Sequence, residues 1–177
     1  MNQTYKYARD FFTALADPAP LDDIFDALHR YIKSIGYPTI YFGIREDPTH
    51  PAPASMENRL IYARDDDGWW SEYSDNRYYL DDPYYELGRQ IRGNFLFTPP
   101  DSLTERQRRF LEYATKRKKM NGFAFSDQMI SGRVWGCSAS GGEKKPNEPQ
   151  IIEIKSAFYA WNRHFNSQLS GAFAKQH

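Results

Sequence analysis

Residues 65–83 read Asp-Asp-Asp-Gly-Trp-Trp-Ser-Glu-Tyr-Ser-Asp-Asn-Arg-Tyr-Tyr-Leu-Asp-Asp-Pro, and our view of the fold depends on them. Trp69 and Tyr73 share one face of the helix that we predict over residues 68–77, because residues four apart lie on one side of a helix. Asp82-Pro83 predicts the start of another helix, since Asp caps an N-terminus and Pro fits the first turn. An indole N–H, a phenol and a carboxylate can therefore converge on one pocket. Such a set suits a small neutral ligand with an amide and a carbonyl at one end and an apolar tail.

The same residues also have a purely structural interpretation. A Trp and a Tyr at helical spacing are more often part of the core, and an Asp before a Pro is more often only a cap, because pockets are few per protein. The residue types alone leave both interpretations open.

The hydrophobic pattern on either side predicts helices and strands in mixed order. The expected helices lie at residues 3–16, 21–35, 103–119 and 151–169. The expected strands lie at residues 39–44, 59–63, 122–129 and 133–140, with a loop at 47–54 and a tight turn at Ser131-Gly132. We find no internal repeat and no domain boundary. This order predicts an α+β fold, a three-layer α-β-α sandwich with a central antiparallel sheet of about five strands.

Composition narrows the class of protein. The 177 residues fit one domain, and the 23 basic side chains balance the 23 acidic ones, so a direct nucleic-acid-binding role is not expected. The single Cys137 excludes an intrachain disulfide, fits a reducing compartment and is expected to be a small buried side chain. No segment resembles a signal peptide or a membrane span, so we expect a cytoplasmic protein.

Other clusters of residues are weaker candidates for a functional site. The basic side chains near the charged helix are diluted by Glu105 and Glu112, and we expect them to form a solvated face; they are Arg106, Arg108, Arg109, Lys116, Arg117, Lys118 and Lys119. The four His residues are scattered and predict no metal site, and residues 65–67 lack the pattern of a calcium loop. No nucleophile or phosphate motif is present, so we expect neither an enzyme nor a cofactor.

The spacing Trp-x3-Tyr, followed after eight residues by Asp-Pro, resembles the pocket signature of the autoinducer-binding domain of LuxR-type quorum-sensing transcriptional regulators. Further segments resemble that family in the same order: Asn94–Pro99, Phe110–Ala114 followed by Gly122, and Gly132–Ser140. The resemblance covers most of residues 60–142.

The resemblance implies a buried N-acyl-homoserine lactone, or a similar small molecule, as the ligand. Trp69 would donate to the lactone carbonyl, Asp82 would accept from the amide N–H, and Tyr73 would pack along the acyl chain. Phe97 would wall the lactone ring and Phe110 would line the apolar part. Either Ser138 or Ala139 would face the amide carbonyl.

Two residues depart from the family pattern. Asp65 stands where the family has a Tyr that contacts the amide carbonyl, and Tyr62 would replace that Tyr only if the loop is remodelled. Phe97 stands in place of a second pocket Trp. These departures leave the ligand open: an unusual acyl group or a ligand that is not a lactone remains an alternative.

The resemblance also implies a domain organisation. Residues 1–170 would form the autoinducer-binding domain and residues 171–177 would begin a linker, with the helix-turn-helix DNA-binding domain absent from this chain. Ligand burial would complete the core and stabilise a homodimer, and DNA would be bound only through the absent domain. The apolar stripe of the last helix, Phe158, Trp161 and Phe165, is either the dimer surface or part of the chain's own core. The alternatives are a truncated protein that blocks a full-length partner and a sensor of GAF or PAS type.

Overall fold

The computed structural model describes residues 3–17, 19–46, 61–90, 93–128 and 134–174. The chain forms two compact units, one of residues 36–146 and one that joins residues 1–35 to residues 147–177. The second unit is made from the two ends of the chain. No local change in composition marks such a division, and the sequence gives no sign of it.

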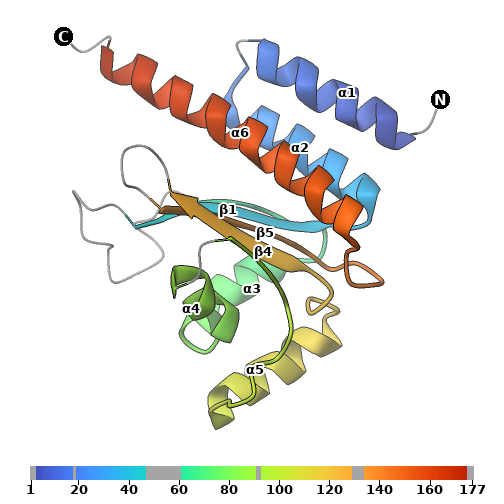
Figure 1. The fold of residues 1–177 in the computed structure, drawn as a ribbon, viewed down its shortest axis with the longest axis vertical. Helices are drawn as coiled ribbons and strands as arrows, with labels where there is room; N and C mark the ends of the chain where they lie inside the picture. The colour runs from blue at the N-terminus through green and yellow to red at the C-terminus, as the bar shows by residue number, and fades with distance from the viewer. Residues whose placement is uncertain (1–2, 18, 47–60, 91–92, 129–133, 175–177) are drawn as a thin grey trace. The chain divides into compact units, whose positions relative to one another are not determined.

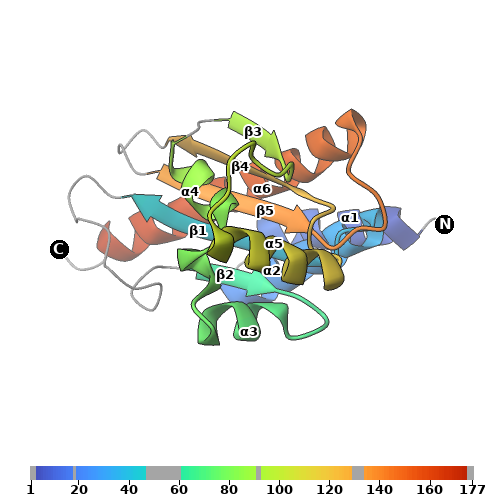
Figure 2. The ribbon, with the colours of Figure 1, turned by 90° about the horizontal axis from the view of Figure 1, so that it is seen from below.

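The unit of residues 36–146 is built on a five-stranded antiparallel sheet in the order β2-β1-β5-β4-β3. Figure 2 shows β2 and β3 at its opposite edges. The strands are β1 (Thr39–Glu46), β2 (Ile61–Arg64), β3 (Gly93–Leu96), β4 (Phe123–Gln128) and β5 (Val134–Ser140).

The register of the strands assigns each side chain to one face of the sheet. Tyr41 lies opposite Ser138, and Ala124 also lies opposite Ser138, so these three side chains share a face. Phe42 lies opposite Cys137, which places both on the other face. Cys137 is buried and forms no disulfide within the described residues, as its place in an apolar strand predicts.

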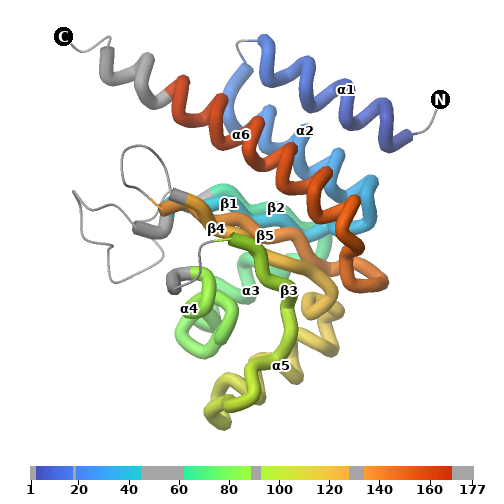
Figure 3. Tube along the Cα trace, in the orientation of Figure 1, coloured from blue at the N-terminus to red at the C-terminus, as the bar shows by residue number. Residues whose placement is uncertain are grey.

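Three helices lie on the same side of the sheet in Figure 1: α3 (Trp69–Asp75), α4 (Pro83–Gln90) and α5 (Glu105–Lys116). A short 3-10 helix, η2 (Tyr78–Leu80), follows α3. In Figure 3 the trace can be followed from β3 to α5. α5 begins with a capping box, in which Thr104 and Gln107 each accept the other's backbone N–H.

The other unit contains α1 (Gln3–Ala16), α2 (Leu21–Ile35) and α6 (Glu148–Ala174). α2 contacts both of the others: the rings of Phe25 and Trp161 are 5.0 Å apart, and the Tyr31 hydroxyl donates to Glu153 at 2.7 Å. Phe158, Trp161 and Phe165 are fully buried within the chain. The stripe therefore belongs to the chain's own interior. The alternative prediction, that these three residues form a dimer surface, is wrong.

The α+β class and the five-stranded antiparallel sheet are confirmed. β3 was not predicted, because it has four residues and only one partner strand. The expected loop at 47–54 and the turn at Ser131-Gly132 lie outside the described residues. Residues 171–174, expected to begin a linker, are the last turn of α6. No helix in the described ranges combines the length and the apolar character that crossing a membrane requires.

We expect Gly122→Ala to lower the free energy of unfolding by about 1–3 kcal/mol, because there is no room for a β-carbon. A Cβ at Gly122 would lie 2.4 Å from the Ala139 carbonyl oxygen and 2.7 Å from the Ser140 Cα, both in the backbone of β5. Urea denaturation measures the change. The control Ser156→Ala, at an exposed position on α6, should change the free energy by less than about 0.5 kcal/mol. Equal stability of the two variants would contradict the packing described here.

Candidate functional site

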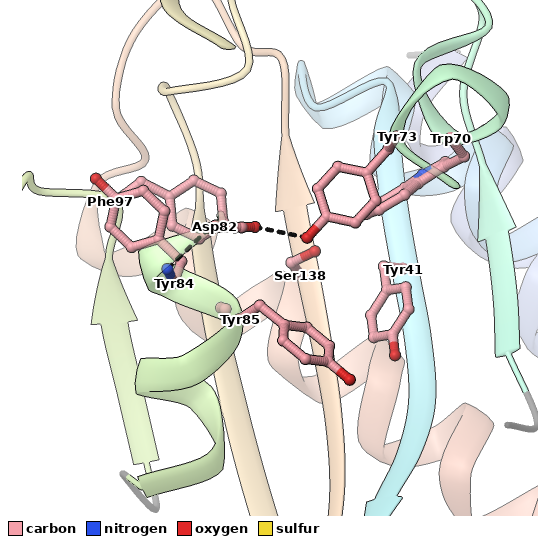
Figure 4. Close-up of a pocket in the computed structure, with 9 residues that line it drawn as sticks. Tyr41, Trp70, Tyr73, Asp82, Tyr84, Tyr85, Phe97 and Ser138 are labelled. Atoms are coloured by element: carbon pink, nitrogen blue, oxygen red, sulfur yellow. Dashed lines mark hydrogen bonds between the residues drawn. The ribbon is translucent and has the colours of Figure 1, made fainter. Parts of the chain in front are cut away.

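A cavity with two overlapping lobes lies on the Tyr41 face of the sheet. The lobes have volumes of about 40 and 60 Å³. Six residues line both: Trp70, Tyr73, Asp82, Tyr84, Phe97 and Ser138. The first lobe adds Tyr41 and Tyr85 (Figure 4), and the second adds Trp69, Phe110 and Lys119. Trp69, Tyr73 and Asp82 all line the second lobe, so the structure brings these three side chains together, and their role in ligand binding stays a prediction.

Asp65 fixes the helix that carries the two Trp residues. Its carboxylate accepts the backbone N–H of Trp69 at 3.0 Å and that of Trp70 at 3.0 Å. It therefore satisfies two of the amides that the start of a helix leaves unpaired. Gly68 adopts a positive φ of 74°, which glycine tolerates, immediately before the helix. The residue that departs from the family pattern thus positions α3.

The two adjacent Trp side chains have different roles. Trp69 is buried, and its ring lies 5.8 Å from that of Tyr73. Among the described residues, the indole N–H of Trp69 has no acceptor. The indole N–H of Trp70 donates to the Ile40 carbonyl on β1 at 2.9 Å. Trp70 therefore attaches α3 to the sheet, and Trp69 retains a donor for the cavity.

Asp82 connects α3 with α4. Its carboxylate accepts the Tyr73 hydroxyl at 2.8 Å and the backbone N–H of Tyr84 at 2.8 Å, as Figure 4 shows. The second bond confirms Asp82 as the cap that the Asp-Pro pair predicts. The carboxylate is thus both a helix cap and part of the cavity wall.

Tyr84 is a lining residue that the sequence analysis did not identify. Its side chain is buried, its ring lies 4.8 Å from that of Phe97, and its hydroxyl is buried with no hydrogen-bond partner among the described residues. Burial, and then the charge of Asp82, raise the pKa of this phenol above its ordinary value, so the hydroxyl keeps its proton. A buried unpaired hydroxyl is costly, and here it offers a polar contact to a ligand.

Lys119 corrects the expectation of a uniformly solvated basic face. Arg106 and Arg109 are exposed as expected, but Lys119 is only 6% exposed. α5 ends at Lys116, and Lys118 adopts a positive φ of 57°, so the chain leaves the helical path before Lys119. Lys119 donates to the Thr39 hydroxyl at 2.8 Å and to the Asp67 carboxylate at 2.9 Å.

The expected strand residues divide between the two faces of the sheet. Ser138 lines both lobes of the cavity. Tyr62 lies opposite Phe42, and Ala139 alternates with Ser138, so the structure places both on the face away from the cavity. Phe97 and Phe110 line the cavity as expected. In the part of the chain that the structure describes, no three His, Cys, Asp or Glu side chains gather as metal ligands would.

A larger hollow of about 590 Å³ lies on α1 and α2. Its lining is mostly polar and includes the exposed Arg30 and Lys33. It lacks the aromatic enclosure of the cavity on the sheet, which is the property that small-molecule sites share.

Comparisons with known proteins agree with this geometry. A family model described as the autoinducer binding domain matches residues 21–169. No curated protein sequence matches the chain.

Solved structures of two proteins, CepR2 and SdiA, show the same fold. One is the N-acylhomoserine lactone dependent LuxR family transcription factor CepR2 from Burkholderia cenocepacia, with a TM-score of 0.65, 14% identity, and coverage of 97% of this chain and 98% of that chain. The other is SdiA in complex with octanoyl-rac-glycerol, with a TM-score of 0.66, 11% identity, and coverage of 93% of this chain and 66% of that chain. Escherichia coli SdiA also matches, with a TM-score of 0.59, 14% identity, and coverage of 90% of this chain and 68% of that chain.

We expect Asp65→Ala to lower the free energy of unfolding by about 1 kcal/mol, because two amides at the start of α3 lose their acceptor. Asp75→Ala is the matched control: it removes an exposed carboxylate from the other end of α3, where the helix dipole does not favour it. Chemical denaturation of both variants tests the assignment. A loss as large for Asp75→Ala as for Asp65→Ala would show that Asp65 is not the cap.

Proposed function

This chain belongs to the family of autoinducer-binding domains, and we propose that it is the ligand-sensing domain of a LuxR-type regulator that binds an N-acyl-homoserine lactone or a close analogue. The observation that carries the proposal is the Asp82 carboxylate in the wall of an aromatic cavity that Trp69 and Tyr73 also line. A carboxylate only accepts hydrogen bonds, so it fits the amide N–H of an acylated ligand.

The remaining polar groups of the cavity wall fit the carbonyl oxygens of the same ligand. In the proposed complex, Trp69 donates its indole N–H to the carbonyl of the head group, and the Ser138 hydroxyl faces the amide carbonyl. Support comes from the sheet register, which puts Ser138 rather than Ala139 on the cavity face. Tyr84 adds a buried hydroxyl that replaces, from α4, the polar contact that the family obtains from the Tyr at the position of Asp65.

The volume of the cavity limits the size of the acyl group that fits without movement of the lining. Ligand sites commonly reach about 300–1,000 Å³, whereas the two lobes have about 40 and 60 Å³. The side chains of Tyr41, Tyr84 and Tyr85 line the first lobe. A short or planar acyl group therefore requires the least movement of the lining, and a long chain requires these rings to turn.

A second class of ligand is favoured by one of the structural relatives. The SdiA structure contains octanoyl-rac-glycerol, which has neither an amide nor a lactone. In a complex of that kind with this chain, Asp82 would accept from ligand hydroxyls instead of an amide N–H. A sensor of a non-lactone molecule is therefore the alternative within the same proposal.

Ligand binding would be coupled to stability and assembly. A ligand that pairs the Tyr84 hydroxyl and fills the cavity binds only the folded state, so it raises the free energy of unfolding. We include in the proposal homodimerisation, a cytoplasmic location and control of transcription through a helix-turn-helix domain on the same or a partner chain. A short protein that pairs with a full-length regulator and blocks it would use the same cavity.

Thermal unfolding against a panel of ligands tests the proposal. The panel consists of N-butanoyl-, N-hexanoyl-, N-octanoyl- and N-dodecanoyl-homoserine lactone, with octanoyl-rac-glycerol as the non-lactone member. A ligand at about one hundred times its Kd adds about 2.7 kcal/mol to the free energy of unfolding, which is a readily measured shift. A shift that depends on chain length supports the proposal, and no shift with any member contradicts it.

We expect Asp82→Asn to weaken binding of the best panel member by about tenfold or more, because a charge-assisted hydrogen bond contributes about 1.5–3 kcal/mol. Asn also caps helices, so the variant should still fold. The control Asp101→Asn removes an exposed carboxylate and should leave the affinity unchanged. Calorimetric titration of both variants measures the effect, and equal affinities would remove Asp82 from the site.

A further inference from the structure

Lys119 is the one buried ammonium among the described residues, and it lies in the cavity wall. A buried charge is costly unless it is paired and hydrogen-bonded. Its acceptors are the Thr39 hydroxyl and the Asp67 carboxylate, and the side chain of Asp67 is 44% exposed. Burial acts to raise the pKa of Asp67, but Lys119 and Arg117 outweigh it and hold that pKa below its ordinary value. Asp67 is therefore negatively charged, and it lies toward solvent.

The ammonium has a donor left over. It carries three N–H groups, and two of them have acceptors. No third acceptor lies within hydrogen-bond distance in the parts of the chain that the structure describes. The Lys119 Nζ also lies 5.7 Å from the centre of the Trp69 ring, whose N–H lacks an acceptor among the same residues. The Lys119 ammonium and the neutral indole N–H of Trp69 are therefore two hydrogen-bond donors on residues that line the same lobe.

We propose that the lobe lined by Lys119 and Trp69 selects a ligand whose head group ends in a carboxylate, so that the chain binds an open-ring N-acyl-homoserine or another N-acyl amino acid more tightly than the closed lactone. The inference rests on the proposed function, because it assigns the acyl amide to Asp82. In an N-acyl amino acid the carboxyl carbon is two bonds from the amide nitrogen. One ligand therefore presents an N–H to Asp82 and an anion to Lys119.

The charges of the lobe favour an anion over a neutral carbonyl. Hydrogen bonds between two ionised groups are shorter and stronger than those to a neutral acceptor. The negative charge of Asp82 opposes a second anion, but its carboxylate already accepts a hydroxyl and a backbone N–H. The Asp67 carboxylate is partly exposed and also pairs with Arg117, so it neutralises the positive charge of Lys119 only in part. The proposal therefore requires charge pairing at Lys119 to exceed repulsion from Asp82, which the comparison of affinities below measures.

Three probes with the same hexanoyl chain test this preference: N-hexanoyl-homoserine, its closed lactone, and N-hexanoyl-homoserine amide, which is open but neutral. Calorimetric titration at neutral pH gives the three Kd values for the unmodified chain and for Lys119→Met, which keeps an unbranched apolar stem. We expect the carboxylate to bind about tenfold to a hundredfold more tightly than the lactone or the amide. Lys119→Met should remove this preference and retain binding of the two neutral probes.

Arg117→Met is the matched control. It removes another cation that contacts Asp67, but Arg117 is not among the residues that line the cavity. It should change stability and leave the ratio of the Kd values unchanged. If Lys119→Met does not fold, Lys119→Gln retains a donor for Thr39 and Asp67 and loses the charge.

Each outcome distinguishes this inference from the proposed function. If the lactone binds as tightly as the carboxylate, or if both Lys119 variants keep the preference, the carboxylate pocket is overturned and the sensing role stands. If none of the three probes binds, the carboxylate pocket is overturned, and the sensing role is decided by the ligand panel described above. A structural role of Lys119 alone would lower the stability of the variants without changing the ratio of affinities.

Discussion

The cavity depends on one shared carboxylate. Asp82 accepts the hydroxyl of Tyr73 from α3 and the backbone N–H of Tyr84 from α4, so a single side chain sets the spacing of two helices that cover the same face of the sheet. Asp82 is half-buried, and these two bonds help to offset the cost of removing its carboxylate from water. In the complex that we propose, a ligand N–H binds the same carboxylate, so the stability of the helices and the affinity of the site would be linked.

Polar groups are distributed through an otherwise aromatic interior. Trp70 uses its N–H to attach α3 to β1, whereas Trp69, Tyr84 and Lys119 keep donors that the described chain does not fully use. A purely structural core would satisfy such groups internally. Their concentration around one cavity supports our proposal of a ligand that supplies the missing acceptors.

The sequence predicts the parts of the site that local spacing controls. Trp69 and Tyr73 lie on one helix face, and Asp82 caps α4, because both properties depend on neighbours within a few residues. Strand register, and the path of the chain after a helix ends, depend on contacts between residues that are far apart in the sequence. For that reason Tyr62 and Ala139 were assigned to the cavity although the sheet turns them away, and Lys119 was assigned to a solvated face although a positive φ at Lys118 precedes its burial. Tyr84 was missed because it follows a Pro at a helix start, where the pattern indicates only a cap.

The measurement that tests the central claim most directly is the indole region of a ¹H–¹⁵N spectrum during titration with N-hexanoyl-homoserine and its lactone. The chain has four Trp residues, of which Trp69 and Trp70 line the cavity and Trp161 lies on α6. Binding in the cavity should move the Trp69 signal most and the Trp70 signal next, and should leave that of Trp161 in place. A titration that moves Trp161 and not Trp69, or that moves none of the four, would contradict a ligand site between α3, α4 and the sheet.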